Sequence, residues 1–196
     1  MLTEPRERRT PLRDLAVPLT AQAAFREAWP AATQYDPDAR LVLITSGEDL
    51  DGAGQAGLWE FFVDLPGRQA QGTFSVGRVE VPEDDDLEYS PILLEQVRPF
   101  VPPGDLWEVL RQGEAATRRY YTAQWLKHLA GRPALPVPFY DSSRAVPALA
   151  AQGVEFGRRG QYLGARVQVT GEAVWYIQVG EDVVVTAFAP LALPPG

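Results

Sequence analysis

The stretch Leu58-Trp59-Glu60-Phe61-Phe62-Val63-Asp64-Leu65 decides the predicted fold of this chain of 196 residues. Its second, fourth, sixth and eighth residues are apolar, whereas Glu60 and Asp64 lie on the opposite side. Apolar residues at every second position are typical of a β-strand that buries one face in a hydrophobic core. The sequence therefore predicts a half-buried strand over residues 58–65, followed by a turn at Pro66-Gly67.

Similar signals place a helix and two more strands around this stretch. Thr20 is a plausible N-cap for a helix over residues 21–29, and Pro30 is expected to end that helix. Two further segments have strand character, residues 40–45 and 73–81. The first part of the chain is thus predicted to run helix, strand, strand, strand.

The last part of the chain repeats this order. Ser143 is a suitable cap for a helix to residue 152, and Gly153 supplies the stop. Three segments then have the composition of strands, residues 165–170, 175–179 and 183–188. The last segment is almost wholly apolar, so we expect it to be buried on both faces.

These two matching orders predict an α+β fold made of two similar α-β-β-β units, each with its own helix and antiparallel sheet. Trp59 and Trp175 begin the inward series of the two middle strands, which favours an internal duplication. The predicted organisation is a polar N-terminal arm (1–15), a first unit (16–82), an acidic and proline-rich connector with central helices (83–139) and a second unit (140–192).

Composition excludes several classes of chemistry. The chain has no cysteine and one histidine, which rules out disulfides, thiolate nucleophiles and any site built on two histidines. The formal net charge of −8 disfavours nucleic acid and anionic lipid as partners. No stretch has the roughly 20 apolar residues of a membrane span, and no export signal is visible. We expect no cofactor and a cytoplasmic location, or export if a signal sequence was trimmed.

The glycine-rich loop at residues 52–57 has the pattern G-x-G-x-x-G, but a strand and not a helix is predicted after it. A phosphate site of this type needs the helix N-terminus, so we interpret the segment as a hairpin loop. Asp49, Asp51 and Glu60 fall at calcium-ligand positions of an EF-hand loop. Ala53 removes one ligand and the flanks are predicted strands, so no metal site is predicted, with these three residues kept as candidates.

The helical region predicted over residues 105–130 carries the remaining candidates. Arg118, Arg119, Tyr120 and Tyr121 are adjacent and offer charge, hydrogen bonds and aromatic surface to a small ligand. His128 stands alone there, and no G-x-S-x-G motif accompanies it, so no nucleophilic triad is predicted.

Short segments resemble a known family. They are Asp36-Pro37-Asp38-Ala39-Arg40-Leu41, Leu58-Trp59-Glu60-Phe61-Phe62-Val63-Asp64, Asp141-Ser142-Ser143-Arg144-Ala145, Gly153-Val154-Glu155-Phe156 and Ala173-Val174-Trp175-Tyr176-Ile177. Together they are similar to PepSY-like domains, and the resemblance implies a cystatin/PepSY-like fold. Such modules are generally non-catalytic and bind or restrain partners such as peptidases, so the resemblance implies no catalytic residues.

The sequence thus favours a non-enzymatic binding or regulatory protein that engages a peptide or protein through a sheet face or edge. The alternative is a small-ligand sensor or hydrolase that uses carboxylate, tyrosine and arginine side chains between the two halves. A structural homodimer is a third hypothesis.

Overall fold

The computed structural model describes residues 5–78, 91–99, 111, 113, 132–157, 160–179 and 182–188. In chain order its elements are β1 (Arg6–Pro11), β2 (Leu19–Thr20), α1 (Ala21–Tyr35), β3 (Arg40–Ser46), β4 (Gln55–Ala56), β5 (Leu58–Leu65), the 3-10 turn η1 (Pro66–Arg68), β6 (Ala70–Gly77), β7 (Ile92–Pro99), α4 (Ser142–Ala150), β8 (Leu163–Val167), β9 (Ala173–Val179) and β10 (Asp182–Ala187).

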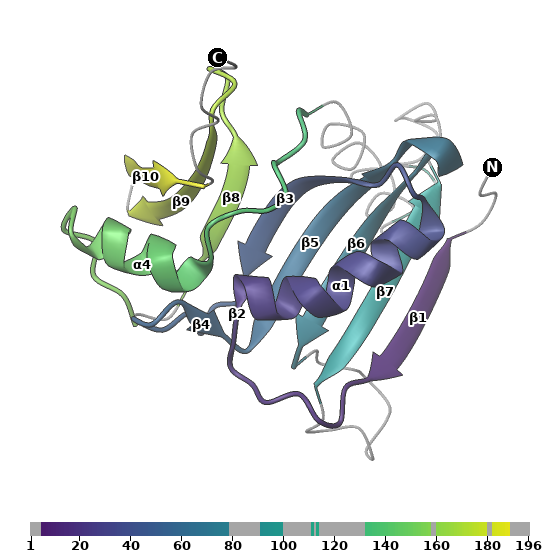
Figure 1. Ribbon diagram of the computed structural model, residues 1–196, viewed down its shortest axis with the longest axis horizontal. Helices are drawn as coiled ribbons and strands as arrows, with labels where there is room; N and C mark the ends of the chain where they lie inside the picture. Colours follow the sequence, from purple (N-terminus) through teal and green to yellow (C-terminus); the bar gives the residue numbers. More distant parts are fainter. Residues whose placement is uncertain are drawn as a thin grey trace.

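One antiparallel sheet of eight strands runs through the molecule in the order β1-β7-β6-β5-β3-β8-β9-β10 (Figure 1). The central junction is the pairing of β3 with β8, in which Ile44 lies opposite Ala165 and Thr45 opposite Gly164. This junction joins the strands from the first 99 residues to the three strands from the end of the chain. Strands β1 and β10 are consequently the two outer strands of the sheet.

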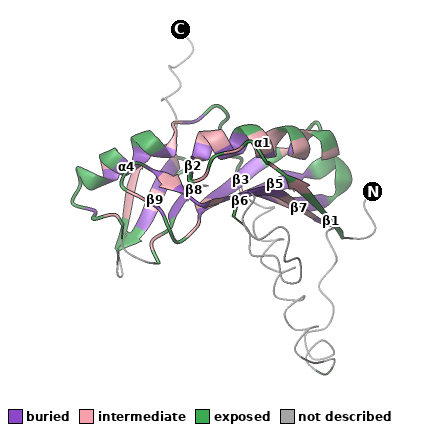
Figure 2. Cartoon of the chain, turned by 90° about the horizontal axis from the view of Figure 1, so that it is seen from below, coloured by how far each residue is buried: buried purple, intermediate pink, exposed green. Residues whose placement is uncertain are grey.

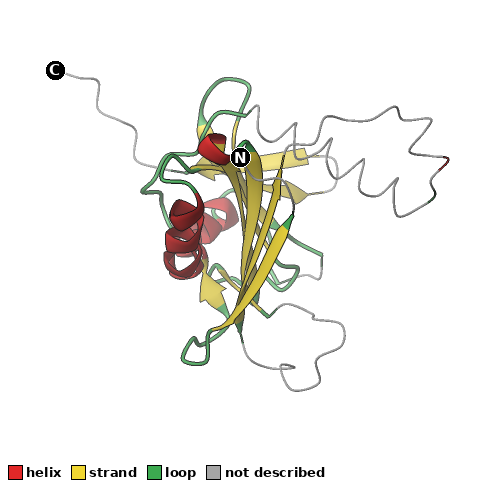
Figure 3. Ribbon diagram, turned by 90° about the vertical axis from the view of Figure 1, so that its right-hand side faces the viewer, coloured by secondary structure: helices red, strands yellow, loops and turns green. Residues whose placement is uncertain are grey.

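Both helices cover the same face of the sheet (Figure 3). Helix α1 contacts β5, β6 and β7, and α4 contacts β10 and the beginning of α1. Figure 2 shows this layer of two helices along one side of the strands, with the buried residues between the layers. We call this the helix face and the opposite side the far face.

The hydrophobic core lies between the helices and the sheet. Trp59 and Trp175 are fully buried in it, with their rings edge to face at 6.3 Å between centroids. Each indole N–H donates to the backbone just before a helix, that of Trp59 to Leu19 O at 2.7 Å and that of Trp175 to Tyr140 O at 2.9 Å. A buried indole needs such a partner, so each tryptophan fixes a helix against the sheet.

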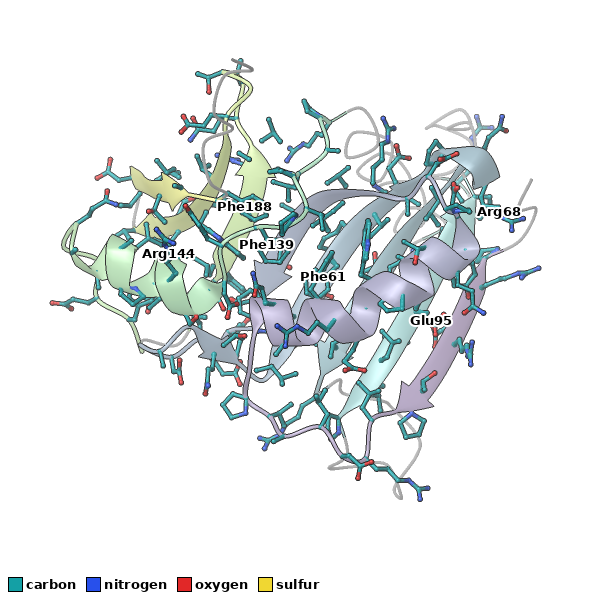
Figure 4. All side chains as sticks on the ribbon, in the orientation of Figure 1. Phe61, Arg68, Glu95, Phe139, Arg144 and Phe188 are labelled. Carbon is teal, nitrogen blue, oxygen red and sulfur yellow. The ribbon has the colours of Figure 1, made fainter. Side chains whose placement is uncertain are left out.

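Aromatic rings continue this core from one helix to the other. Phe139 stacks on Phe188 at 5.0 Å between ring centroids and meets Phe25 of α1 edge to face at 5.3 Å. Phe25 in turn contacts Phe61 of β5. Figure 4 shows Phe61, Phe139 and Phe188 in the interior between the two helices. The burial of Trp59, Phe61, Phe74 and Trp175, as the alternation predicted, is confirmed.

The predicted fold class is wrong. The chain does not form two helix-plus-sheet units of the α+β kind, because it is mostly sheet and its strands join into one continuous eight-stranded sheet. Alternation in the sequence identified strands but carried no information about which strands pair. The early part of the chain also supplies β1 and β7, for which the predicted pattern of three strands had no place.

Several predicted boundaries also need correction. Helix α1 continues through Pro30 to Tyr35, because the proline ring lies on the exposed side of the helix. Part of the predicted proline-rich connector is strand β7, and part of the predicted polar arm is strand β1. The segment expected to be buried on both faces is β10, which instead forms an outer strand.

Candidate functional site: the open edge of the sheet

The candidate ligand residues Arg118, Arg119, Tyr120 and Tyr121 lie outside the described residues, as does His128. The structure therefore leaves the hypothesis that they form a ligand site untested. The three candidate metal ligands, in contrast, are all described.

Asp49 and Asp51 hold the backbone of the glycine-rich loop. Both carboxylate oxygens of Asp49 accept the N–H of Gly57 at 2.9 Å. Asp51 Oδ1 accepts the N–H groups of Ala53 and Gln55 at 2.9 and 2.7 Å. A side chain at Gly57 would collide with the Asp49 carboxylate, which accounts for a glycine there. These two carboxylates thus have structural partners within their own loop.

Glu60 lies on the far face of the sheet, away from that loop. Its carboxylate is within 3.4 Å of Thr45 Oγ1 and of Ser75 Oγ, both on neighbouring strands. Glu60 therefore has contacts separate from those of Asp49 and Asp51. In the described part of the chain no three acidic or histidine side chains gather as a metal site requires.

Another row of polar side chains crosses the far face beside Glu60. Asp64 of β5 lies opposite Arg40 of β3 on one side and opposite Gln71 of β6 on the other. Gln71 in turn lies opposite Arg98 of β7. Arg40 forms an ion pair with Asp64, whose side chain is almost fully buried. Gln71 is 1% exposed, and within the described residues neither its amide nitrogen nor its amide oxygen has a hydrogen-bond partner. Asp64 and Gln71 are thus the buried members of this row, and Arg40 is exposed.

The two outer strands offer the accessible backbone of the sheet, and β1 is protected. The N–H of Leu12 donates to Pro91 O on the β7 side at 2.8 Å, so alternation directs the backbone of Glu7, Arg9 and Pro11 outward. Proline has no N–H to offer a further strand. Charged side chains and proline at an edge discourage the addition of another strand.

The charges along β1 are also satisfied locally. Arg9 donates to Glu7 at 2.8 Å, and Gln96 of β7 donates to the same carboxylate at 3.0 Å. The hydrogen bond from Gln96, followed by that from Arg9, lowers the pKa of Glu7 below its ordinary value. The carboxylate is therefore held in its charged form at neutral pH and adds to the protection of this edge.

Strand β10, at the other end of the sheet, has a very different composition. It reads Asp-Val-Val-Val-Thr-Ala, so Asp182 is its only charged residue and no proline interrupts it. The exposed fraction of Val183 is 44%, and that of Val179, in the adjacent β9, is also 44%. β-Branched residues favour extended backbone, and exposed apolar residues at an edge favour pairing with another strand.

Hydrogen bonds in the neighbouring strands show to which side each residue of β10 turns its backbone N–H and C=O groups. The N–H of Leu163 in β8 donates to Ser46 Oγ of β3 at 2.9 Å, so Leu163 turns its backbone groups toward β3 and away from β9. Leu163 lies opposite Ile177 of β9, and Ile177 lies opposite Val184 of β10. Opposite residues of an antiparallel pair turn their backbone groups either both toward each other or both away. Since Leu163 turns its groups away from β9, Ile177 turns its N–H and C=O away from β8 and toward Val184 of β10. Successive residues of a strand turn to alternate sides.

It follows that Val183 and Val185 direct their N–H and C=O groups away from β9, along the open edge. A side-chain contact agrees with this direction: Nε2 of Gln152, which follows α4, donates to the carbonyl oxygen of Val185 at 3.1 Å. That side chain reaches the carbonyl from outside the sheet. Among the described residues, the outward backbone groups of Val183 and Val185 pair with no further strand, and the carbonyl of Val185 accepts only the side chain of Gln152.

This edge could not be predicted from the sequence, because the position of a strand in a sheet depends on long-range pairing. Three consecutive valines indicate a strand, but only the pairing of β3 with β8 places β10 last in the order. The single local signal was Asp182, since a charged residue at the start of an apolar strand is a common feature of edges.

Comparison with protein families, curated proteins and solved structures finds no match for this chain. Within the described residues, no helix is long and apolar enough to cross a membrane.

Proposed function

We propose that this chain is a non-enzymatic binding protein that takes up an extended segment of a partner protein along β10. In strand addition, an extended peptide hydrogen-bonds to the free backbone of a sheet edge, and its alternate side chains contact the two faces. The observation that carries the proposal is the outer position of β10 with Val183 and Val185 directed outward.

Two further features support strand addition at β10. The opposite edge, β1, carries charge and a proline, so the sheet has one protected edge and one open edge among its described strands. The sequence segments that resemble PepSY-like modules support the same function, because those modules bind or restrain protein partners.

A displayed library of random nine-residue peptides, selected against the full chain, tests the proposal. We expect the selected peptides to lose at least ten-fold in affinity, measured by fluorescence anisotropy, for the variant Val185→Pro. Proline removes the outward N–H of residue 185 but no hydrogen bond to β9, so the sheet is expected to fold normally. Circular dichroism and thermal unfolding verify the fold.

The matched control is Arg9→Pro, which removes an outward N–H from the opposite edge. It is expected to leave the affinity unchanged. A second edge variant, Val183→Lys, introduces the kind of charge that protects natural edges and is expected to weaken binding as well. Peptides that bind both edge variants as tightly as they bind the unmodified chain would refute the proposal.

A further inference from the structure

Gln152 already occupies one hydrogen-bonding position of the open edge. It follows the last turn of α4, its side chain is exposed, and its Nε2 donates to Val185 O at 3.1 Å. In strand addition that carbonyl receives a backbone N–H from the incoming strand. The carboxamide of Gln152 has the same donor chemistry as a peptide N–H, so it stands where the partner's amide is expected.

Moving the Gln152 side chain away from Val185 costs little free energy. The same Nε2 also lies 3.3 Å from Ala148 O in α4, so the amide keeps a partner when it leaves Val185. Glutamine side chains are long and rotate freely when exposed. An incoming strand therefore competes with one hydrogen bond and encounters no packed obstruction from this side chain.

The side chains of β10 indicate the kind of segment that fits. Val183 and Val185 present β-branched side chains on the far face, where apolar and β-branched residues pair well across strands. Asp182 is exposed at the beginning of the strand and favours a lysine or arginine opposite it. The net charge of −8 attracts a basic segment over a longer range.

We infer that Gln152 is a displaceable substitute for the partner's backbone amide, and that the partner is a basic, β-branched extended segment of another protein. This inference rests on the proposed function and adds to it the class of segment and the residue that the segment displaces. In this inference Gln152 tunes the affinity of the edge by competing with the incoming strand for the carbonyl of Val185.

The experiment measures the tightest-binding peptide of the library against Gln152→Ala and against Gln96→Ala in the full chain. Loss of one competing hydrogen bond is expected to tighten binding by about 2- to 10-fold in Gln152→Ala. Gln96 is the matched control because its Nε2 donates to Glu7 beside the opposite edge. Its replacement is expected to change nothing. A peptide with its lysines and arginines replaced by glutamate is expected to bind at least five-fold more weakly.

The outcomes separate this inference from the proposed function. If Val185→Pro abolishes binding but Gln152→Ala leaves the affinity unchanged, strand addition stands and the role of Gln152 is refuted. Weaker binding by Gln152→Ala also refutes that role, because it shows that the side chain contacts the peptide directly. Equal binding of the basic peptide and its glutamate version refutes the proposed class of partner.

Discussion

In the described part of the chain, Gln71 is the buried residue whose side-chain amide lacks hydrogen-bond partners. Its side chain is buried between strands, with Asp64 opposite it on β5 and Arg98 opposite it on β7. Asp64 is engaged by Arg40, and the amide of Gln71 makes no hydrogen bond. Burying a polar group without a partner costs about 1–3 kcal/mol, so Gln71 weakens the sheet that it helps to form.

Replacing Gln71 by methionine is expected to raise the free energy of unfolding by about 1–2 kcal/mol. Methionine has a similar length, and it removes the unpartnered amide without adding a polar group. Urea unfolding followed by tryptophan fluorescence measures the change. The control Gln96→Met alters a partly exposed and hydrogen-bonded glutamine on β7 and is expected to give no gain. A loss of stability in Gln71→Met would show that the amide is satisfied in solution.

Individual residues of the core could be predicted from the sequence because burial follows alternation directly. Trp59 and Trp175 were identified on the inward sides of their strands, and both are fully buried. Gln71 could not be identified in this way. Its burial depends on neighbours in β5 and β7, and no local pattern in the sequence reports such neighbours.

At the scale of elements, the beginnings of α1 and α4 are tied together by two side chains. Asp141, the N-cap of α4, accepts the N–H of Gln22 in α1 at 2.9 Å as well as that of Ser142 at 2.8 Å. Ser142 Oγ accepts the N–H of Ala21 at 2.9 Å and donates to Gly54 O at 2.6 Å. One helix therefore supplies caps to the first turn of the other.

The variant Ser142→Ala is expected to lower the free energy of unfolding by about 1–3 kcal/mol. It leaves the N–H of Ala21 and the carbonyl of Gly54 buried without their partner. Ser143→Ala is the matched control, because the Ser143 side chain is exposed and its hydroxyl donates to the neighbouring Asp141. Denaturant unfolding measures the free energy of unfolding of both variants. Equal values for Ser142→Ala and Ser143→Ala would contradict the role of Ser142 as a shared cap.

The elements themselves were only partly predictable. The alternation of residues 58–65 predicted β5 with its correct face, whereas β1 has no apolar alternation and exists because β7 lies beside it. Helix α1 was predicted to stop at Pro30. It continues to Tyr35 because Pro30 removes only the hydrogen bond to the carbonyl of Arg26, on an exposed side of the helix where water can solvate that carbonyl.

At the scale of the whole molecule, the pairing of β3 with β8 produces one sheet and one core. Trp59 from the first part of the chain touches Trp175 from the last part, and Phe139 links Phe25 to Phe188. The same pairing leaves β10 at the end of the sheet. Order of this kind is set by contacts more than 100 residues apart, so periodicity within the sequence could not reveal it.

Amide hydrogen exchange by NMR, residue by residue along β10, tests most directly whether this edge is open and receives a strand. In the isolated chain, we predict rapid exchange at Val183 and Val185 and slow exchange at Val184 and Thr186, which face β9. Addition of the selected peptide is predicted to slow exchange at Val183 and Val185. Equally slow exchange at all four residues without peptide, or continued rapid exchange at Val183 and Val185 with saturating peptide, would contradict these predictions.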